Sequence, residues 1–177
     1  MARLNMPHGL PDILAPHLDV LFCGINPGMT AATTRHHFAG NSNRFWRVLH
    51  LAGFTPEQII PEQDRTILRY GYGLTTVVQR PTASADQLSP EEFVAAAAGF
   101  RRKLRRQAPR MLAFLGKAGY AGLSAQRDIA WGMQAVRMEG AAVWVLPNPS
   151  GRNRAFNLDQ LVHAYRELYL AIGQRGQ

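Results

Sequence analysis

The apolar run Val20-Leu21-Phe22-Cys23 ends abruptly at Gly24-Ile25-Asn26-Pro27-Gly28. A continuous apolar run bounded by turn residues is typical of a strand covered on both faces, as in a parallel α/β sheet. Ligands of such sheets bind outside the carboxyl ends of the strands. Asn26 is therefore a candidate functional residue. The alternative is an ordinary turn in which Asn26 hydrogen-bonds its own backbone.

Short apolar strands and amphipathic helices alternate along the rest of the chain. The sequence predicts strands over residues 19–23, 73–78, 111–115 and 142–146. It predicts helices over about residues 43–53, 55–71 with an interruption at Pro61, 90–107 with a capping box at Ser89, 117–123 and 158–172. This alternation predicts the α/β class, as a single three-layer α/β/α domain over residues 1–177 with a four-stranded, mainly parallel sheet.

Two segments are expected to lack regular structure. Residues 1–17, which include Pro7, Pro11 and Pro16, are expected to form an irregular lead-in with at most a short turn near residues 12–14. Residues 30–43 are polar, and their length favours a functional loop over a bare connector.

Composition limits the class of protein. The 177 residues are 46% hydrophobic and 18% charged, which suits one globular domain with a substantial core. No apolar run is long enough for a membrane span and no signal-peptide pattern is present, so we expect a cytoplasmic protein. The single cysteine, Cys23, is expected to be a buried thiol, and the histidines show no zinc spacing, so no metal is expected.

The charge balance points to a polyanionic partner. Twenty Lys and Arg residues against twelve Asp and Glu residues give a formal net charge of +8. Such an excess favours nucleic acid, and the alternative is charge that serves only solubility. Much of the excess lies within residues 101–110, where basic side chains recur all around a predicted helix. We expect many of them to face solvent.

A second strand-end loop stands out at Asn148-Pro149-Ser150-Gly151-Arg152-Asn153-Arg154, after the strand predicted at 142–146. In a parallel sheet it would project from the same edge as Asn26. A proline-stiffened loop with two arginines can press on a phosphate backbone or insert into a duplex. The alternative is a turn with solvated arginines. We call residues 148–154 the Asn148 loop.

The two loops together closely resemble those of the mismatch-specific uracil-DNA glycosylases, relatives of thymine-DNA glycosylase within the uracil-DNA glycosylase superfamily. The resemblance rests on Gly24-Ile25-Asn26-Pro27-Gly28 and Asn148-Pro149-Ser150-Gly151. The segments between them are also similar and come in the family's order: Asn43-Arg44-Phe45-Trp46, Arg80-Pro81-Thr82, Leu115-Gly116-Lys117 and Trp144-Val145-Leu146-Pro147. A series of this length is far more specific than one motif.

The resemblance implies a four-stranded parallel sheet flanked by helices and an activity on double-stranded DNA. The family removes uracil, preferentially from G·U mispairs, and related lesions such as ethenocytosine. It cleaves the N-glycosidic bond without a metal or organic cofactor. The target nucleotide must first be flipped out of the duplex, because the reacting carbon is inaccessible inside the stack. A monomer is expected.

The resemblance also implies residue roles at the first loop. Asn26 would hold the attacking water, which an amide can orient but cannot deprotonate as a carboxylate would. Phe38 would stack on the flipped base, and the backbone around Gly24, Ile25 and Phe38 would hydrogen-bond the pyrimidine edge. Without the resemblance, a loop phenylalanine is more often a core residue.

The Asn148 loop would, by the same resemblance, fill the gap left by the flipped base and contact the opposite guanine. The loop residues assigned to this role are Asn148, Ser150, Gly151, Arg152, Asn153 and Arg154. Arg152 stands where the family commonly has leucine, and a guanidinium can stack while also carrying charge. The strictness of the requirement for a mispaired guanine is therefore open. Arg154 suits guanine or phosphate.

The chain itself suggests one further group. Asp86 follows Arg80-Pro81-Thr82 at the end of a predicted strand, on the same edge as Asn26. We hypothesise that Asp86 supplies the carboxylate that Asn26 lacks, either to activate the water or to stabilise the cationic sugar. The alternative, a solvated acid before a capped helix, is the commoner case. The adjacent His36 and His37 are expected to face solvent or phosphate.

Two other classes of function compete with a glycosylase. A non-catalytic nucleic-acid-binding module would explain the charge but not two stiff loops on one edge. A nucleotide-binding α/β enzyme is disfavoured because the chain has neither a Gly-x-Gly-x-x-Gly fingerprint nor a Gly-x-x-x-x-Gly-Lys-Ser/Thr motif. Release of a base from DNA separates these classes.

Overall fold

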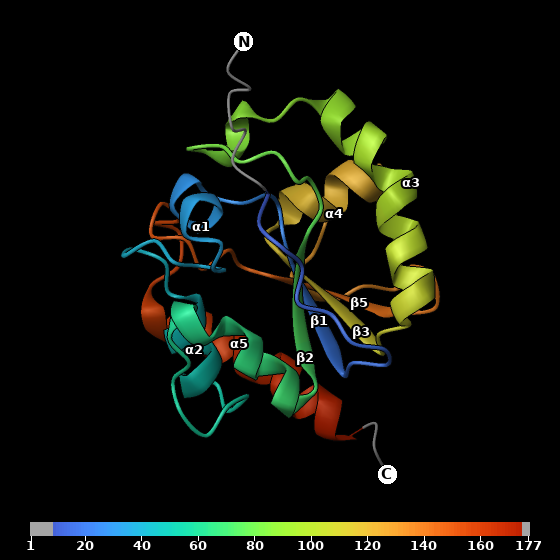
Figure 1. Ribbon diagram of the computed structural model, residues 1–177. Coiled ribbons are helices and arrows are strands. Elements are labelled where there is room, and N and C mark those ends of the chain that lie inside the picture. The colour runs from blue at the N-terminus through green and yellow to red at the C-terminus, as the bar shows by residue number, and fades with distance from the viewer. Residues whose placement is uncertain (1–8, 175–177) are drawn as a thin grey trace.

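The computed structural model describes residues 9–174, which form one sheet with helices on both sides (Figure 1). The sheet has five strands in the order β2-β1-β3-β5-β4. Their bounds are β1 Val20–Gly24, β2 Tyr72–Thr76, β3 Met111–Leu115, β4 Gly132–Met133 and β5 Ala142–Leu146. β4 pairs antiparallel with β5, whereas β2, β1, β3 and β5 are parallel.

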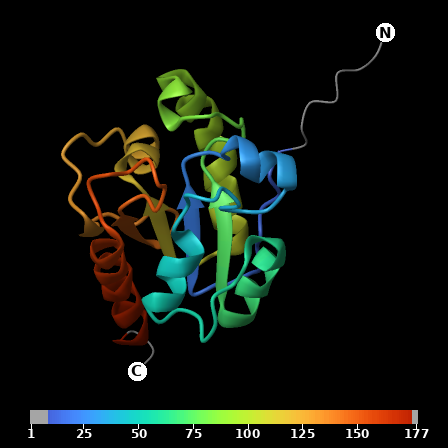
Figure 2. The ribbon, with the colours of Figure 1, turned by 90° about the vertical axis from the view of Figure 1, so that its left-hand side faces the viewer.

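The helical segments connect these strands. They are α1 Met29–Thr34, α2 Phe45–Leu51, the 3₁₀ segments η1 Pro61–Tyr70 and η2 Ala85–Gln87, α3 Pro90–Gln107, α4 Lys117–Ser124 and α5 Leu158–Gln174. α3 begins where the sequence predicts, because Ser89 and Glu92 form a capping box around its first turn. In Figures 1 and 2, α2 and α5 lie on one side of the sheet and α3 and α4 on the other.

Both faces of β1 are buried, which explains its unbroken apolar sequence. Val20 and Phe22 pack in a cluster that includes α2 and α5 residues, whereas Leu21 and Cys23 pack in a cluster that includes α3 and α4 residues. Burial raises the pKa of the Cys23 thiol, so it stays protonated. The predicted α/β class, the three layers and the buried cysteine are confirmed.

The structure corrects four details of the prediction. The sheet has a fifth strand, β4, whose two residues are too short to show alternation. α1 occupies part of the expected 30–43 loop. Residues 55–60 are not helical, and helical structure starts at Pro61. Near residues 12–14 the backbone of Ile13 forms an antiparallel bridge with Leu74 instead of a turn.

None of the helices in residues 9–174 is long and apolar enough to cross a membrane. Within the same residues, no three His, Cys, Asp or Glu side chains are grouped so that they could hold a metal ion.

Candidate active site

A cavity of about 390 Å³ lies at the carboxyl edge of the parallel strands. The segments after β1, β2 and β5 all contribute to its lining, together with residues 37–40, 42 and 43. The predicted site residues that line it are Gly24, Ile25, Asn26, Phe38, Asn148, Ser150 and Arg152. The fold therefore brings both predicted loops to one cavity.

Asn26 is held in one orientation by its side-chain amide. Its Nδ2 donates to the Arg80 carbonyl and to Thr82 Oγ1, each at 2.8 Å. Thr82 Oγ1 in turn donates to the Ser84 carbonyl at 2.8 Å, so it can only accept from Asn26. Both N–H groups of the amide are thus used. Oδ1 has no hydrogen-bond partner among residues 9–174 and is available as an acceptor within the cavity.

The segments after β1 and β2 stay paired beyond the strands, which brings residues 80–82 to Asn26. The Val78 N–H donates to the Ile25 carbonyl at 3.0 Å, and the Thr82 N–H donates to the Pro27 carbonyl at 3.1 Å. Asn26 is therefore oriented by backbone and side-chain groups more than fifty residues away in the sequence.

Phe38 forms an aromatic wall of the cavity. One face of its ring stacks on Phe45, with the centroids 4.0 Å apart and the planes 26° from parallel. Its backbone φ is 55°, a left-handed conformation that is uncommon for a residue other than glycine. Phe38 is half-buried. It packs against the hydrophobic core and also lines the cavity, so it can serve both the fold and the site.

The segment before Phe38 is fixed by a buried carboxylate. Asp64 Oδ2 accepts the His37 backbone N–H at 3.0 Å, and His37 Nε2 donates to the Pro11 carbonyl at 2.8 Å. The expectation that both histidines face solvent is wrong for His37, which is only 2% exposed. Burial lowers its pKa, whereas the hydrogen bond to Pro11 opposes that shift. His36 is half-buried, and its Nδ1 lies 3.5 Å from Asp64 Oδ1.

The Asn148 loop is folded on itself. Asn148 Oδ1 accepts the Ser150 N–H at 2.9 Å, and Asn153 Nδ2 donates to the Asn148 carbonyl at 3.0 Å. At its base, the buried Tyr165 hydroxyl donates to the Pro147 carbonyl at 3.0 Å, and burial raises the pKa of this hydroxyl so that it remains a donor. Arg152 is exposed and borders the cavity.

Four predicted residues do not line the cavity. Gly151 and Arg154 are exposed residues of the Asn148 loop, and Asn153 is a half-buried one whose side chain bonds the Asn148 carbonyl. A Cβ on Gly151 would lie 2.6 Å from the Ser42 Cβ, so only glycine fits where this loop meets residues 39–43. Asp86 is an exposed residue of η2, one position beyond the lining residue Ala85. This exposure agrees with the alternative that Asp86 is a solvated acid before a capped helix.

Two residues of the site carried no assigned role in the sequence. Thr82 fixes the Asn26 amide, and Asn43 lines the cavity while its Oδ1 accepts the Phe45 N–H at 2.9 Å. Both lie in short segments on which the family resemblance rests, Arg80-Pro81-Thr82 and Asn43-Arg44-Phe45-Trp46. Membership of these segments is the feature of the sequence that indicates a role in the site.

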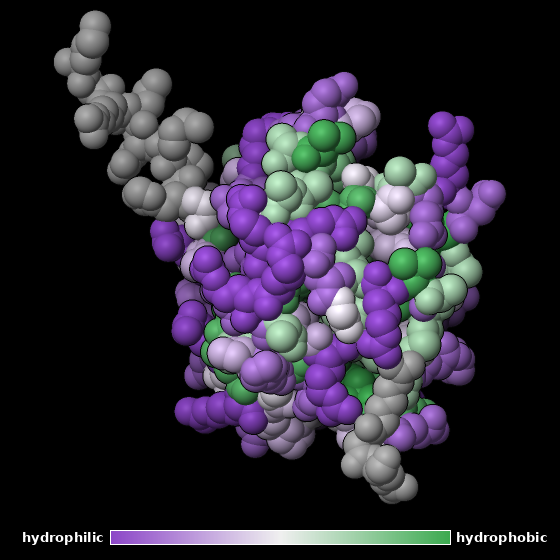
Figure 3. All heavy atoms as spheres, turned by 90° about the vertical axis from the view of Figure 1, so that its right-hand side faces the viewer, coloured by the Kyte–Doolittle hydropathy of each residue, from purple (hydrophilic) through white to green (hydrophobic). Residues whose placement is uncertain are grey.

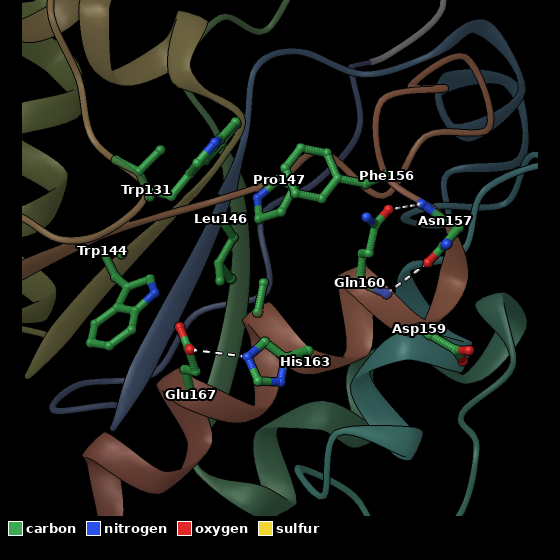
Figure 4. Close-up of a pocket in the computed structure, with 13 residues that line it drawn as sticks. Trp131, Trp144, Leu146, Pro147, Phe156, Asn157, Asp159, Gln160, His163 and Glu167 are labelled. Atoms are coloured by element: carbon green, nitrogen blue, oxygen red, sulfur yellow. Dashed lines mark hydrogen bonds and ion pairs between the residues drawn. The ribbon is translucent and has the colours of Figure 1, made fainter.

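A second cavity, of about 430 Å³, lies between the β4–β5 edge and α5 (Figure 4). Several of its polar groups are already paired. His163 Nε2 lies 3.2 Å from Glu167 Oε1, the Asn157 backbone N–H donates to Gln160 Oε1 at 2.8 Å, and the Gln160 backbone N–H donates to Asn157 Oδ1 at 2.9 Å. Trp131, at its rim, is covered by Lys117 Nζ at 4.4 Å from the ring centroid. This second cavity contains none of the predicted site residues, and we do not assign it as the active site despite its size.

The family of the chain follows from its sequence together with this geometry. A family model described as the uracil DNA glycosylase superfamily matches residues 11–169, which include both strand-end loops. The chain belongs to this superfamily. The match spans every segment that lines the Asn26 cavity apart from Leu10.

A solved structure supports the superfamily fold. The chain is similar to a protein of Methanosarcina acetivorans, provisionally named a uracil DNA glycosylase, whose solution NMR structure aligns with a TM-score of 0.63 at 22% sequence identity. The alignment covers 92% of this chain and 98% of that one. At this identity the likeness concerns the fold alone.

Proposed function

We propose that this chain is a mismatch-specific uracil-DNA glycosylase. It would flip uracil out of double-stranded DNA, preferentially from G·U mispairs, and hydrolyse the N-glycosidic bond with a water held by Asn26. The observation that carries the proposal is the Asn26 side chain, whose Nδ2 is fully hydrogen-bonded and whose Oδ1 remains available in the cavity. Superfamily membership supports glycosylase chemistry, and the motif resemblance supports the mismatch-specific type.

In the proposed reaction the water oxygen attacks C1′ of the deoxyribose. The C1′–N1 bond breaks, its electron pair leaves with the uracil as an anion, and the water loses a proton to solvent. The uracil anion then takes up a proton from solvent. An abasic sugar and free uracil remain. An amide oxygen aligns the water without taking its proton, so positioning and leaving-group stability would supply most of the rate enhancement.

The flipped base would stack on Phe38, which is already backed by Phe45. Stacking of a base on an aromatic ring is worth about 1–3 kcal/mol and tolerates different bases. The backbone around Gly24, Ile25 and Phe38 would bind the pyrimidine edge and take up the charge that develops on the leaving uracil. The same arrangement would admit related lesions such as ethenocytosine.

The Asn148 loop would occupy the space vacated by the flipped nucleotide. Arg152 is exposed and borders the cavity, which supports a role for its side chain in the stack next to the extruded base. A guanidinium at this position can stack on neighbouring bases and is less selective than an apolar wedge. We therefore propose a preference for G·U that is graded and not absolute, with Arg154 on the opposite guanine or a phosphate.

The role of Asp86 stays a prediction. The Asp86→Asn variant removes the carboxylate charge at nearly constant shape, so a catalytic Asp86 requires a fall in the single-turnover rate at saturating enzyme. An unchanged rate would leave Asp86 as a solvated residue of η2.

The substrate proposal is tested by single-turnover base release from four otherwise identical oligonucleotides: a G·U duplex, an A·U duplex, a G·T duplex and single-stranded uracil DNA. We expect uracil release to be fastest from G·U and measurable from A·U. Equal rates from G·U and A·U would remove the mismatch preference. Tight duplex binding without release of any base would replace the glycosylase with a binding module.

A further inference from the structure

One arginine outside the predicted site connects the base-binding wall to the Asn148 loop. Arg44 directly precedes Phe45, the residue that backs the Phe38 ring. Its backbone N–H donates to the Pro149 carbonyl at 3.0 Å, which joins the start of α2 to the loop. The Arg44 side chain also bonds the Asn148 loop.

The Arg44 guanidinium donates hydrogen bonds to four backbone carbonyls of residues 149–156. Nε donates to Pro149 at 3.2 Å and Nη1 to Phe156 at 2.8 Å. Nη2 donates to Ser150 at 2.8 Å and to Asn153 at 3.0 Å. The two ends and the middle of an irregular segment are therefore tied to one planar group.

Only arginine suits this arrangement. Its guanidinium presents five N–H donors in a rigid fork, whereas a lysine ammonium is a compact point charge that cannot reach separated carbonyls at once. Within residues 9–174 the side-chain partners of Arg44 are all neutral carbonyls, so no carboxylate cancels its charge beside the Asn148 loop. The loop is thus both held in shape and backed by a positive charge.

We propose that Arg44 is a positioning residue that holds the Asn148 loop in the shape that enters a DNA duplex, and that it serves excision from duplex DNA without acting on the reaction at Asn26. This inference rests on the proposed function. A loop that replaces a base in the stack must keep its shape against neighbouring base pairs, and misplacement by about 1 Å can cost about a hundredfold in rate. Single-stranded substrate needs no such replacement.

The test compares uracil release from a G·U duplex and from the same strand alone, in single turnovers with Arg44→Met, Arg44→Lys and Arg47→Met. Arg47 is an exposed arginine of α2 and serves as the matched control for lost charge. For Arg44→Met we expect a loss of about tenfold or more on the duplex and less than about twofold on the single strand. Arg44→Lys should resemble Arg44→Met on the duplex, and Arg47→Met should leave the ratio unchanged.

Equal slowing on both substrates would overturn the proposal, because loss of folded protein affects both alike. A duplex rate for Arg44→Lys equal to that of the wild type would overturn it too, since charge alone would then suffice. If Arg44→Met does not fold, Arg44→Lys carries the comparison.

A binding measurement keeps the inference separate from the proposed function. We expect the wild type to prefer a duplex with a stable abasic-site analogue over an intact duplex, and Arg44→Met to lose most of that preference. If the wild type releases no base, the proposed function fails, while the binding ratio still tests Arg44. Equal ratios in the wild type and Arg44→Met would overturn the positioning role.

Discussion

The orientation of Asn26 depends on the hydroxyl of Thr82, a residue that lines the same cavity. Thr82 Oγ1 accepts from Asn26 Nδ2 and donates to the Ser84 carbonyl, so it fixes which atom of the amide remains free. Replacing Thr82 by Val keeps the shape but removes the acceptor. We expect a fall of about tenfold in single-turnover base release, because a freed amide no longer aligns the water.

Thr82→Ser is the matched control, since it retains the hydroxyl and should stay within about twofold of the wild type. Duplex affinity should be unchanged in both variants. A Thr82→Val rate equal to that of Thr82→Ser would show that the hydroxyl does not orient Asn26.

His37 makes the stability of the fold depend on pH. Burial lowers its pKa from the ordinary 6.5, so between the two values the unfolded chain binds more protons than the folded one. The contribution is fully present above pH 6.5 and is lost as the pH falls below it. Urea unfolding at pH 7.5 and at pH 5 should show a smaller loss in His37→Gln, which does not titrate. An equal loss in both proteins would assign the pH effect to other groups.

Individual residues differ in how far the sequence could predict them. Asn26 is predictable because a polar side chain after a buried strand must emerge at the sheet edge. The partners of its amide are not, because Arg80 and Thr82 reach it through pairing that continues beyond β1 and β2. The clamp of Arg44 on four carbonyls depends on loop geometry that no local pattern encodes.

Among the elements, buried strands and capped helices follow their sequences. β3 and β5 have the predicted bounds because each is apolar on both faces and ends at glycine or proline. β4 and α1 were missed because both are too short for their periodicity to show, and both exist through tertiary context.

Two glycines give opposite predictions about stability. Gly99 is exposed in α3, and a Cβ there would meet only the flexible end of Arg102 at 3.6 Å. Gly99→Ala should raise the free energy of unfolding by about 0.5–1 kcal/mol, the difference in helix propensity. A Cβ on Gly73 would lie 2.5 Å from the Ile13 carbonyl that bridges to Leu74.

Gly73→Ala should therefore lower the free energy of unfolding by about 1–3 kcal/mol, because backbone must move to admit the methyl group. Urea unfolding of both variants at one pH gives the two differences. A stabilising Gly73→Ala would mean that the Ile13 bridge is not a fixed part of the fold.

Across the whole molecule, the basic residues are not distributed evenly around the proposed site. α3 starts at the carboxyl edge of the sheet and ends at Gln107, shortly before β3 begins, so its basic end lies toward the edge opposite Asn26. Arg101 and Arg105 pair with Glu139 near that end. Lys103 pairs with Asp12 beside Thr75 of β2, so its charge is also compensated within the fold. Figure 3 shows hydrophilic residues over much of the side of the molecule that α3 covers.

This distribution predicts which charges a DNA duplex meets. Arg154 lies in the Asn148 loop, whereas Arg106 is exposed at the far end of α3. Arg154→Gln should reduce the slope of log affinity against log salt concentration by about one, the effect of one lost phosphate contact. Arg106→Gln, with the same charge change, should leave the slope unaltered. A larger effect for Arg106→Gln would place the duplex on α3.

The proposed reaction depends on the water that Asn26 is proposed to hold. The most direct measurement is single-turnover uracil release from a G·U duplex by the wild type and by Asn26→Ala, with duplex affinity measured in parallel. We predict release by the wild type, a loss of about a hundredfold or more in Asn26→Ala, and nearly equal duplex binding. Undiminished release by Asn26→Ala would show that Asn26 does not hold the attacking water.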